Sequence, residues 1–320
     1  MAGANLPAKK YKHSTPTQLR LVFQFPEGRS GGYIDIAQAL SVMNRRFYRQ
    51  GSYYYINSFE VETLQDGYAQ VEVIPDTWVT QQAWKRAFGT FQKMNSMVDT
   101  PRPKYHDFKV FMDAQHRDDL NNGQPNLLPI VTNGIGATGG LASDEWDYAQ
   151  FVNFNDRDVE NSNPNQFNMH VIGDHVTSNA GSLSEYASVG MIKSYARSRV
   201  LPSPSGEPEV PANNDDDPLT LLFQASEVHA LEEIAEHLDT MNDTTPYDRD
   251  FYPGMSSTAG LIPLERLYTS GSPQGRAHKV SGACVPFGLL RVSSEGYPAG
   301  FRLIINVASG TYNGVYAERV

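Results

Sequence analysis

An apolar side chain at every second position near both ends of the chain is the sequence feature that most limits the fold. In residues 18–25, and again in residues 300–308, one face is apolar throughout, and Arg20, Gln24, Arg302 and Asn306 lie on the other; the residues of the apolar face are Leu19, Leu21, Phe23, Phe25, Phe301, Leu303, Ile305 and Val307. Because successive side chains of a strand point to opposite faces, each segment is predicted to form a strand buried on one side. Although these two strands are far apart in sequence, we expect them to pair within one sheet.

The rest of the chain adds further strands and few helices. Strands are predicted at 52–63, 69–74, 108–112, 146–154, 167–172 and 283–293, so about eight are expected in all. The 320 residues include 17 Tyr, 15 Phe, 26 Gly and 20 Pro, which is typical of strands joined by ordered loops. We therefore predict a mainly β protein, an antiparallel eight-stranded jelly-roll sandwich with helices and long insertions in its loops.

The segments that lack a clear strand pattern predict the domain organisation. Residues 1–17 are polar and basic and are predicted to form a short flexible arm. Residues 18–320 are predicted to form a single jelly-roll domain with loop insertions around 113–145 and 175–280. The second insertion contains residues 202–218, which hold five prolines and are predicted to be extended and exposed.

Helices are expected only in the connections. Asp35 is a candidate N-cap for a helix over 35–50, a second helix is predicted to start near Thr80, and a third over 218–241. Residues 186–200 fit either a helix or a strand. The dipeptide Asp66-Gly67 predicts a hairpin turn between the strands at 52–63 and 69–74.

Positive charge is concentrated near the start of an acidic chain. The formal net charge is -10, yet residues 1–50 hold eight Lys and Arg against two acidic residues. A basic arm on an acidic body predicts a two-faced subunit that contacts a polyanion on one face. The candidate nucleic-acid-binding residues are Lys9, Lys10, Lys12, Arg45, Arg46 and Arg49. The alternative is that these arginines form a solvated helix surface or bind a neighbouring subunit.

Composition also bears on where the protein is made. The chain has one cysteine, Cys284, no apolar run of about 18 residues, and a polar start without a signal-like apolar region. We expect a protein synthesised in a reducing cytoplasm without a secretory signal, and no association with a membrane.

Three patterns resemble binding motifs without completing them. Residues Gly134–Gly140 match G-x-G-x-x-G, but no helical apolar stripe follows, so a flexible loop is expected. His229, Glu233 and His237 share a face of the predicted helix 218–241, but the two histidines are two turns apart, too far for one metal. The acidic run 156–160 lacks the glycine of a calcium loop. We predict no catalytic residues, no metal and no cofactor.

The first third of the chain resembles a known family. Asn44-Arg45-Arg46-Phe47-Tyr48-Arg49-Gln50-Gly51 precedes a tyrosine-rich strand, and Ile74-Pro75-Asp76-Thr77-Trp78-Val79-Thr80 leads to Ala83-Trp84-Lys85. Over roughly residues 15–112 this arrangement resembles capsid proteins of small circular single-stranded DNA (Rep-encoding, CRESS-type) viruses from environmental samples. The resemblance implies a non-enzymatic virion protein, many copies of which form an icosahedral shell around single-stranded DNA. Such proteins often begin with a long arginine-rich arm, where this chain has three lysines.

Two other classes of function stay open at this point. One is a β-sandwich attachment or carbohydrate-binding protein, for which Tyr247, Phe251 and Tyr252 would provide an aromatic platform. The other is an enzyme that uses Gly134–Gly140 to hold a phosphate-bearing ligand.

Overall fold

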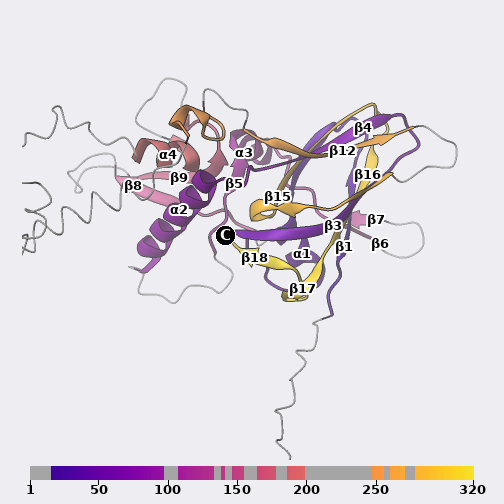
Figure 1. Ribbon diagram of the computed structural model, residues 1–320, viewed down its shortest axis with the longest axis horizontal. Helices are drawn as coiled ribbons and strands as arrows, with labels where there is room; N and C mark the ends of the chain where they lie inside the picture. Colours follow the sequence, from indigo (N-terminus) through magenta and orange to yellow (C-terminus); the bar gives the residue numbers. More distant parts are fainter. Residues whose placement is uncertain are drawn as a thin grey trace, which may run out of the picture.

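Two antiparallel sheets form the larger part of the molecule. The computed structural model describes residues 16–96, 107–132, 138–140, 146–154, 164–177, 186–198, 247–255, 260–270 and 278–320. The first sheet has the order β1 (Arg20–Phe25), β16 (Phe301–Val307), β3 (Ser52–Glu62), β13 (His278–Ser281); the short strands β14 (Cys284–Val285) and β18 (Ala317–Arg319) also pair with β3. The second has the order β12 (Ile262–Thr269), β4 (Gly67–Val73), β15 (Leu289–Glu295), β2 (Gly31–Asp35). Figure 1 shows the two sheets facing each other.

The strand partners of this sandwich are nested along the chain. β1 pairs with β16, β2 with β15, β3 with β13, and β4 with β12, all antiparallel. Pairing of β16 with β3 and of β15 with β4 completes the two sheets. The prediction of a mainly β protein with antiparallel sheets is therefore confirmed, as is the pairing of the first strand with the last.

The alternating side chains of β1 and β16 point into the space between the sheets. Leu21, Phe23 and Phe25 are fully buried, and the apolar side chains of β16 join them in one cluster. Phe25 lies opposite Phe301 in the register, and their rings stack 4.3 Å apart. Burying each such side chain is worth about 1.5–3 kcal/mol, which is why this pairing holds although it joins the two ends of the chain.

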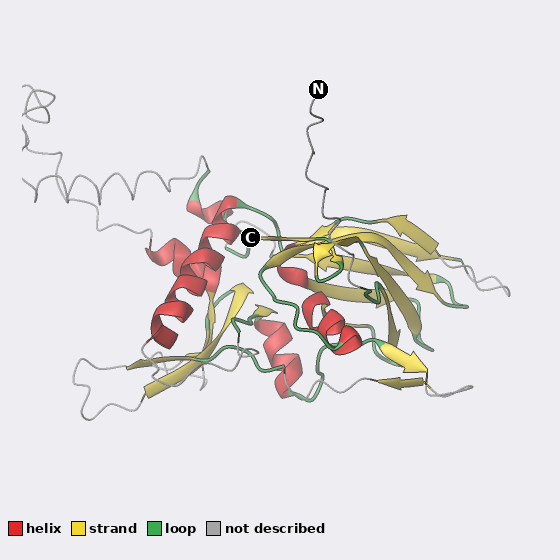
Figure 2. Cartoon of the chain, turned by 90° about the horizontal axis from the view of Figure 1, so that it is seen from below, coloured by secondary structure: helices red, strands yellow, loops and turns green. Residues whose placement is uncertain are grey.

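A second, smaller unit lies between β4 and β12 in sequence and at one end of the sandwich in space (Figures 1 and 2). Its sheet has the order β10 (Val176–Thr177), β11 (Tyr186–Gly190), β9 (Pro164–Ile172), β5 (Phe111–Asp113), and β8 (Phe151–Phe154) also pairs with β9. Here β5 and β11 run parallel to β9. The helices α2 (Trp78–Ser96) and α4 (Met191–Ser198) pack together and against β9, and α3 (Ala114–Asn121) contacts β5.

Aromatic and charged contacts attach this unit to the sandwich. Trp84 of α2 stacks on Phe287, 4.4 Å away in the 3-10 turn η2 (Pro286–Gly288), and contacts Phe108 edge-on at 5.0 Å. Arg291 of β15 is ion-paired with Glu72 and also approaches Asp113 of the second unit. Trp84, Phe108 and Phe287 belong to one hydrophobic cluster that also takes in Tyr33 of β2 and Leu289 of β15, so side chains of the two units share a hydrophobic interior.

A buried polar network crosses the same boundary. Asp35 accepts hydrogen bonds from the Ala37 and Gln38 amides, at 2.9 and 3.2 Å, and thereby caps α1 (Ile36–Asn44). Its other oxygen accepts a 2.8 Å bond from Gln50, which bonds both backbone groups of Val110 in the second unit. Backbone groups without ladder partners are thus paired inside the protein rather than with water.

Two titratable groups in this network are shifted in opposite directions. Burial raises the pKa of Asp35 to about 6, although its hydrogen bonds act against the shift. Burial lowers the pKa of His116 to about 4. The His116 ring is neutral: Nδ1 accepts from the Met112 amide, so Nε2 carries the hydrogen and donates to Asn126. Asn126 donates in turn to Gln38 on α1.

Several local predictions need correction. The helix predicted over 35–50 starts where expected but ends at Asn44, because Arg45 adopts a left-handed conformation with φ 53°. The turn at Asp66-Gly67 does not close a β-hairpin, since β3 and β4 belong to different sheets. Residues 186–200 contain both a strand and a helix, β11 and α4.

The predicted insertions also differ from the observed architecture. The strand expected at 108–112 is β5 and belongs to the second unit rather than to the sandwich. The insertion predicted at 175–280 contains two sandwich strands, β12 and β13. Neither strand has a clear apolar alternation in the sequence. In β12 only Leu267 is fully buried, and β13 is only four residues long. The predicted helix 218–241 and residues 1–15 of the predicted arm 1–17 lie outside the described residues.

The opposed shifts of Asp35 and His116 predict an unusual pH dependence. Because the pKa of Asp35 rises from about 3.9 unfolded to about 6 folded, its stabilising contribution is full below pH ~4 and is lost as the pH rises. His116, with a pKa that falls from about 6.5 to about 4, contributes fully above pH ~6.5 and loses that contribution on acidification. The two therefore oppose each other between these values.

We expect Asp35→Asn to expose the acid sensitivity of His116. Between pH 6.5 and 4 the variant's free energy of unfolding should fall by up to about 3 kcal/mol more than that of the wild type, from two pKa units at ~1.4 kcal/mol each. Urea unfolding at several pH values measures this. His116→Asn should have the opposite effect, so that its free energy of unfolding rises relative to that of the wild type as the pH falls from 6.5 to 4. Parallel pH profiles of the free energy of unfolding for all three proteins would contradict the assignment.

Candidate nucleic-acid interface

The basic arm leaves the sandwich beside the arginines that follow α1. Arg46 donates a 2.9 Å hydrogen bond to the Pro16 carbonyl and approaches the Thr17 hydroxyl at 3.4 Å. Thr17 donates to the carbonyl of Asn313, and Gln18 forms reciprocal backbone bonds with the Asn44 side chain. These contacts fix residues 16–18, the root of the predicted arm, beside residues 44–46.

The three candidate arginines do not share a helix face. Arg45 is exposed and ends α1 in the left-handed region. Arg46 donates hydrogen bonds to Pro16 and Thr17 at the root of the arm. Arg49 lies in the loop before β3, and its side chain forms a 2.9 Å ion pair with Asp107 while remaining 52% exposed. The alternative that these arginines form a solvated helix surface is wrong, because α1 ends at Asn44, before all three.

The arginines therefore differ in how freely each guanidinium can bind a phosphate. Arg45 has no hydrogen bond or ion pair to the described part of the chain and is available to a phosphate. The charge of Arg49 is partly balanced by Asp107, and such an exposed pair is worth only about 0–1 kcal/mol, so a phosphate can compete with it. Lys9, Lys10 and Lys12 lie outside the described residues, and their contribution stays a prediction.

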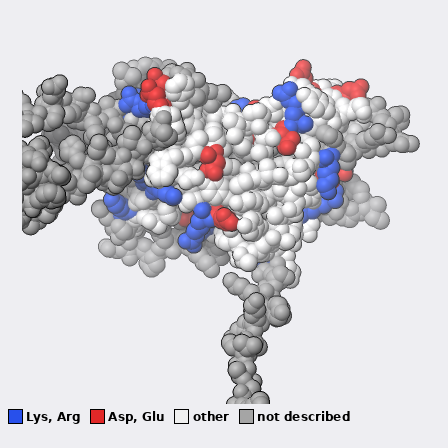
Figure 3. Space-filling model, viewed as in Figure 1, with Lys and Arg blue, Asp and Glu red and all other residues white. Residues whose placement is uncertain are grey.

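The surface around the sandwich carries mixed charge. On the face seen in Figure 3, lysines and arginines are scattered and have acidic side chains near them. No broad basic patch is visible on this face among the residues drawn in colour. This face of a single copy thus offers few phosphate contacts, and counterion release from it is small.

Lys109 is a cation near this loop that sequence reasoning missed. It is 3% exposed, and its ammonium lies 4.5 Å from the centre of the Trp146 ring and 5.8 Å from that of Phe47. Burial lowers its pKa, whereas Asp35 and two further aspartates act against this. Its position inside the apolar segment 108–112 gave no sign of a cation–π site, because Trp146 is distant in sequence. Being buried, it stabilises the fold and does not reach a phosphate.

The other motifs give no site in the described regions. Thr138–Gly140, the described part of the glycine motif, forms strand β7, which pairs with β6 (Ile130–Thr132); a dinucleotide site needs a helix N-terminus there. His229, Glu233, His237 and the acidic runs lie outside the described residues. Among the residues that are described, no three His, Cys, Asp or Glu side chains are grouped to hold a metal. No described helix has the length and apolar character needed to span a membrane.

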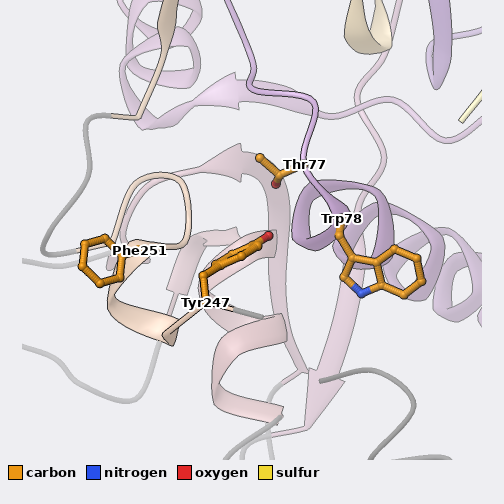
Figure 4. A pocket seen from close by; sticks show the side chains of 4 residues that line it. All are labelled: Thr77, Trp78, Tyr247 and Phe251. Carbon is orange, nitrogen blue, oxygen red and sulfur yellow. The ribbon is translucent and has the colours of Figure 1, made fainter. Parts of the chain in front are cut away.

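Aromatic side chains gather instead at the start of α2. Thr77, Trp78, Tyr247 and Phe251 line an open, almost wholly apolar hollow of about 540 Å³ (Figure 4). Trp78 is 47% and Phe251 58% exposed. Tyr252, predicted as part of an aromatic platform, is instead 5% exposed and packs in the second hydrophobic cluster. Of the three residues predicted to form the platform, Tyr247 and Phe251 line the hollow, together with Trp78, which was not predicted.

Comparison with known proteins identifies no relative. No protein-family model, no curated protein and no solved structure matches this chain.

The separate roles of Arg45 and Arg46 can be tested by substitution. Arg46→Ala removes the hydrogen bonds at the root of the arm and should lower the free energy of unfolding by about 1 kcal/mol. Arg45→Ala, the matched control, should change it by less than ~0.5 kcal/mol. Chemical denaturation measures both values. Equal losses from the two variants would show that Arg46 does not anchor the arm.

Proposed function

We propose that this chain is a viral capsid subunit that self-assembles into an icosahedral shell around a single-stranded DNA genome, and that its sandwich is a jelly roll. The observation that carries the proposal is the nested pairing of eight strands. In chain order these are β1, β2, β3, β4, β12, β13, β15 and β16, and they pair first with last, second with seventh, third with sixth, and fourth with fifth.

This order is the one expected when a long antiparallel hairpin is rolled into a barrel. Rolling brings the eighth strand beside the third and the seventh beside the fourth, and β16–β3 and β15–β4 are such neighbours. Double-sheet jelly rolls occur in viral capsids but also in lectins and cupins. The topology therefore supports the fold proposal, and the function must be argued from other features.

Two features favour a shell protein among these classes. The resemblance over residues 15–112 coincides with β1 to β5, including the loop that carries the three arginines. In addition, the root of the basic arm is fixed at that loop by Arg46, so every copy presents its arm and Arg45 at one place. In a closed shell, weak phosphate contacts repeated in many copies act together and bind a genome firmly.

A carbohydrate-binding role is less well supported. A sugar site needs several polar groups to bond hydroxyls around its aromatic platform. The aromatic hollow is almost entirely apolar, and Tyr252 is buried away from it. We therefore retain the shell protein as the proposal, with virions as its location, synthesis in the host cell and no catalytic role.

Assembly is the direct test. We expect the purified chain, expressed alone, to form uniform closed particles in negative-stain electron micrographs, with nuclease-protected nucleic acid inside. The reason is that weak phosphate contacts from many arms retain nucleic acid firmly only when the copies are held together in a closed shell. A stable monomer or small ring at high protein concentration would contradict the proposal.

The arm can be tested separately from the shell. Lys9→Ala, Lys10→Ala and Lys12→Ala together should leave particles intact but reduce the protected nucleic acid and make its retention more sensitive to salt, since phosphate binding depends on cation number. The ratio of absorbance at 260 and 280 nm across a salt series measures this. Lys85→Ala with Lys93→Ala, on α2, is the control; an equal loss in the control would refute a specific role for the arm.

A further inference from the structure

The aromatic hollow formed by Thr77, Trp78, Tyr247 and Phe251 is not used by the proposed shell function. Its side chains come from two places in the chain, the start of α2 and the 3-10 turn η1 (Arg249–Phe251). Figure 4 shows the Tyr247 ring between Phe251 and Trp78, so that the three aromatic side chains form a row. An exposed row of aromatic rings with little polar lining favours a largely apolar occupant, and an extended one could contact all three rings.

We propose that this hollow is the docking site for the proline-rich segment of the same chain, residues 201–211. That stretch reads Leu-Pro-Ser-Pro-Ser-Gly-Glu-Pro-Glu-Val-Pro and holds four prolines. Proline-rich peptides favour the polyproline II conformation and bind grooves lined by aromatic side chains, losing little entropy because they are already extended.

The hydrogen-bonding chemistry of the hollow fits this occupant. Prolines have no backbone N–H, so a proline-rich strand presents mainly carbonyl acceptors. The Trp78 indole N–H is a donor only, and no hydrogen bond connects it to the described residues. Proline rings stack on aromatic faces, while the indole donates to a carbonyl between them. A sugar, with hydroxyl groups on every side, would leave most of its bonds unmade here.

The segment is also close enough to reach the hollow within one copy. It begins shortly after α4, which ends at Ser198. On α4, the Tyr195 ring lies 6.4 Å from the Tyr252 ring, which lies 5.9 Å from that of Tyr247 at the hollow. Pro202 follows Ser198 by four residues, a span of up to about 14 Å, and the chain returns at Tyr247 itself. An occupant in the same chain needs only weak affinity, because its effective concentration is high.

The test uses a full-length variant whose residues 201–211 are replaced by Gly and Ser, so that the hollow is vacant. A fluorescein-labelled peptide of residues 199–212 is titrated into it, and binding is followed by fluorescence anisotropy. We expect saturable binding that Phe251→Ala weakens at least tenfold, with Trp78→Phe weakening it through loss of the donor. Tyr268→Ala is the matched control, because Tyr268 and Phe251 are both 58% exposed; it should leave binding unchanged within twofold.

Three outcomes of the peptide titration would overturn the proposal. These are no binding to the vacated variant, equal binding before and after Phe251→Ala, and displacement of the peptide by simple oligosaccharides. To test the same-chain assignment, a photo-crosslinker at position 204 of the intact chain is activated in a mixture of isotopically light and heavy protein. Crosslinks to the hollow within one isotope class support the proposal, whereas predominantly mixed crosslinks would assign the segment to a neighbouring copy and refute it.

Discussion

Pairing between the two ends of the chain is the constraint on which the rest of the structure depends. Once β1 lies against β16, with Phe25 stacked on Phe301, the strands between them are brought together as successive nested pairs. Each pair covers apolar surface left by the previous one. The cost is the entropy of closing very long loops, which grows only slowly with length. That slow growth explains how the fold accommodates a whole second unit between β4 and β12.

The second unit packs against the sandwich and contributes to its stability. Trp84 of the second unit stacks on Phe287 beside β15, and the network from Asp35 through Gln50 to Val110 links the backbones of the two units. Asp35 has three roles at once: it ends β2, caps α1 and anchors Gln50. Burial of such a group is expensive unless its hydrogen bonds are satisfied, so the geometry of this boundary is held tightly. The loop that follows α1, and with it the root of the arm, is positioned as a result.

The candidate interface illustrates how tertiary contacts assign different roles to similar residues. The three arginines look equivalent in the sequence. In the structure, Arg45 has no hydrogen bond or ion pair to the described residues, Arg46 binds Pro16 and Thr17, and Arg49 is paired with Asp107. These partners are distant in sequence, so local helical periodicity could not reveal them, and it could not show that Arg45 turns left-handed and ends the helix.

The sequence by itself determined the strand content, the pairing of the chain ends and the cap at Asp35, because alternation and capping depend on neighbouring residues. It also marked residues 202–218 as proline-rich and residues 1–17 as basic. Only the tertiary structure decided that β12 and β13 belong to the sandwich, because their weak patterns are buried by partners far along the chain. It alone separated β3 from β4 into opposite sheets, buried Tyr252 and Lys109, and brought Trp78 to the same hollow as Tyr247 and Phe251. Those outcomes depend on long-range contacts, for which local side-chain periodicity has no signal.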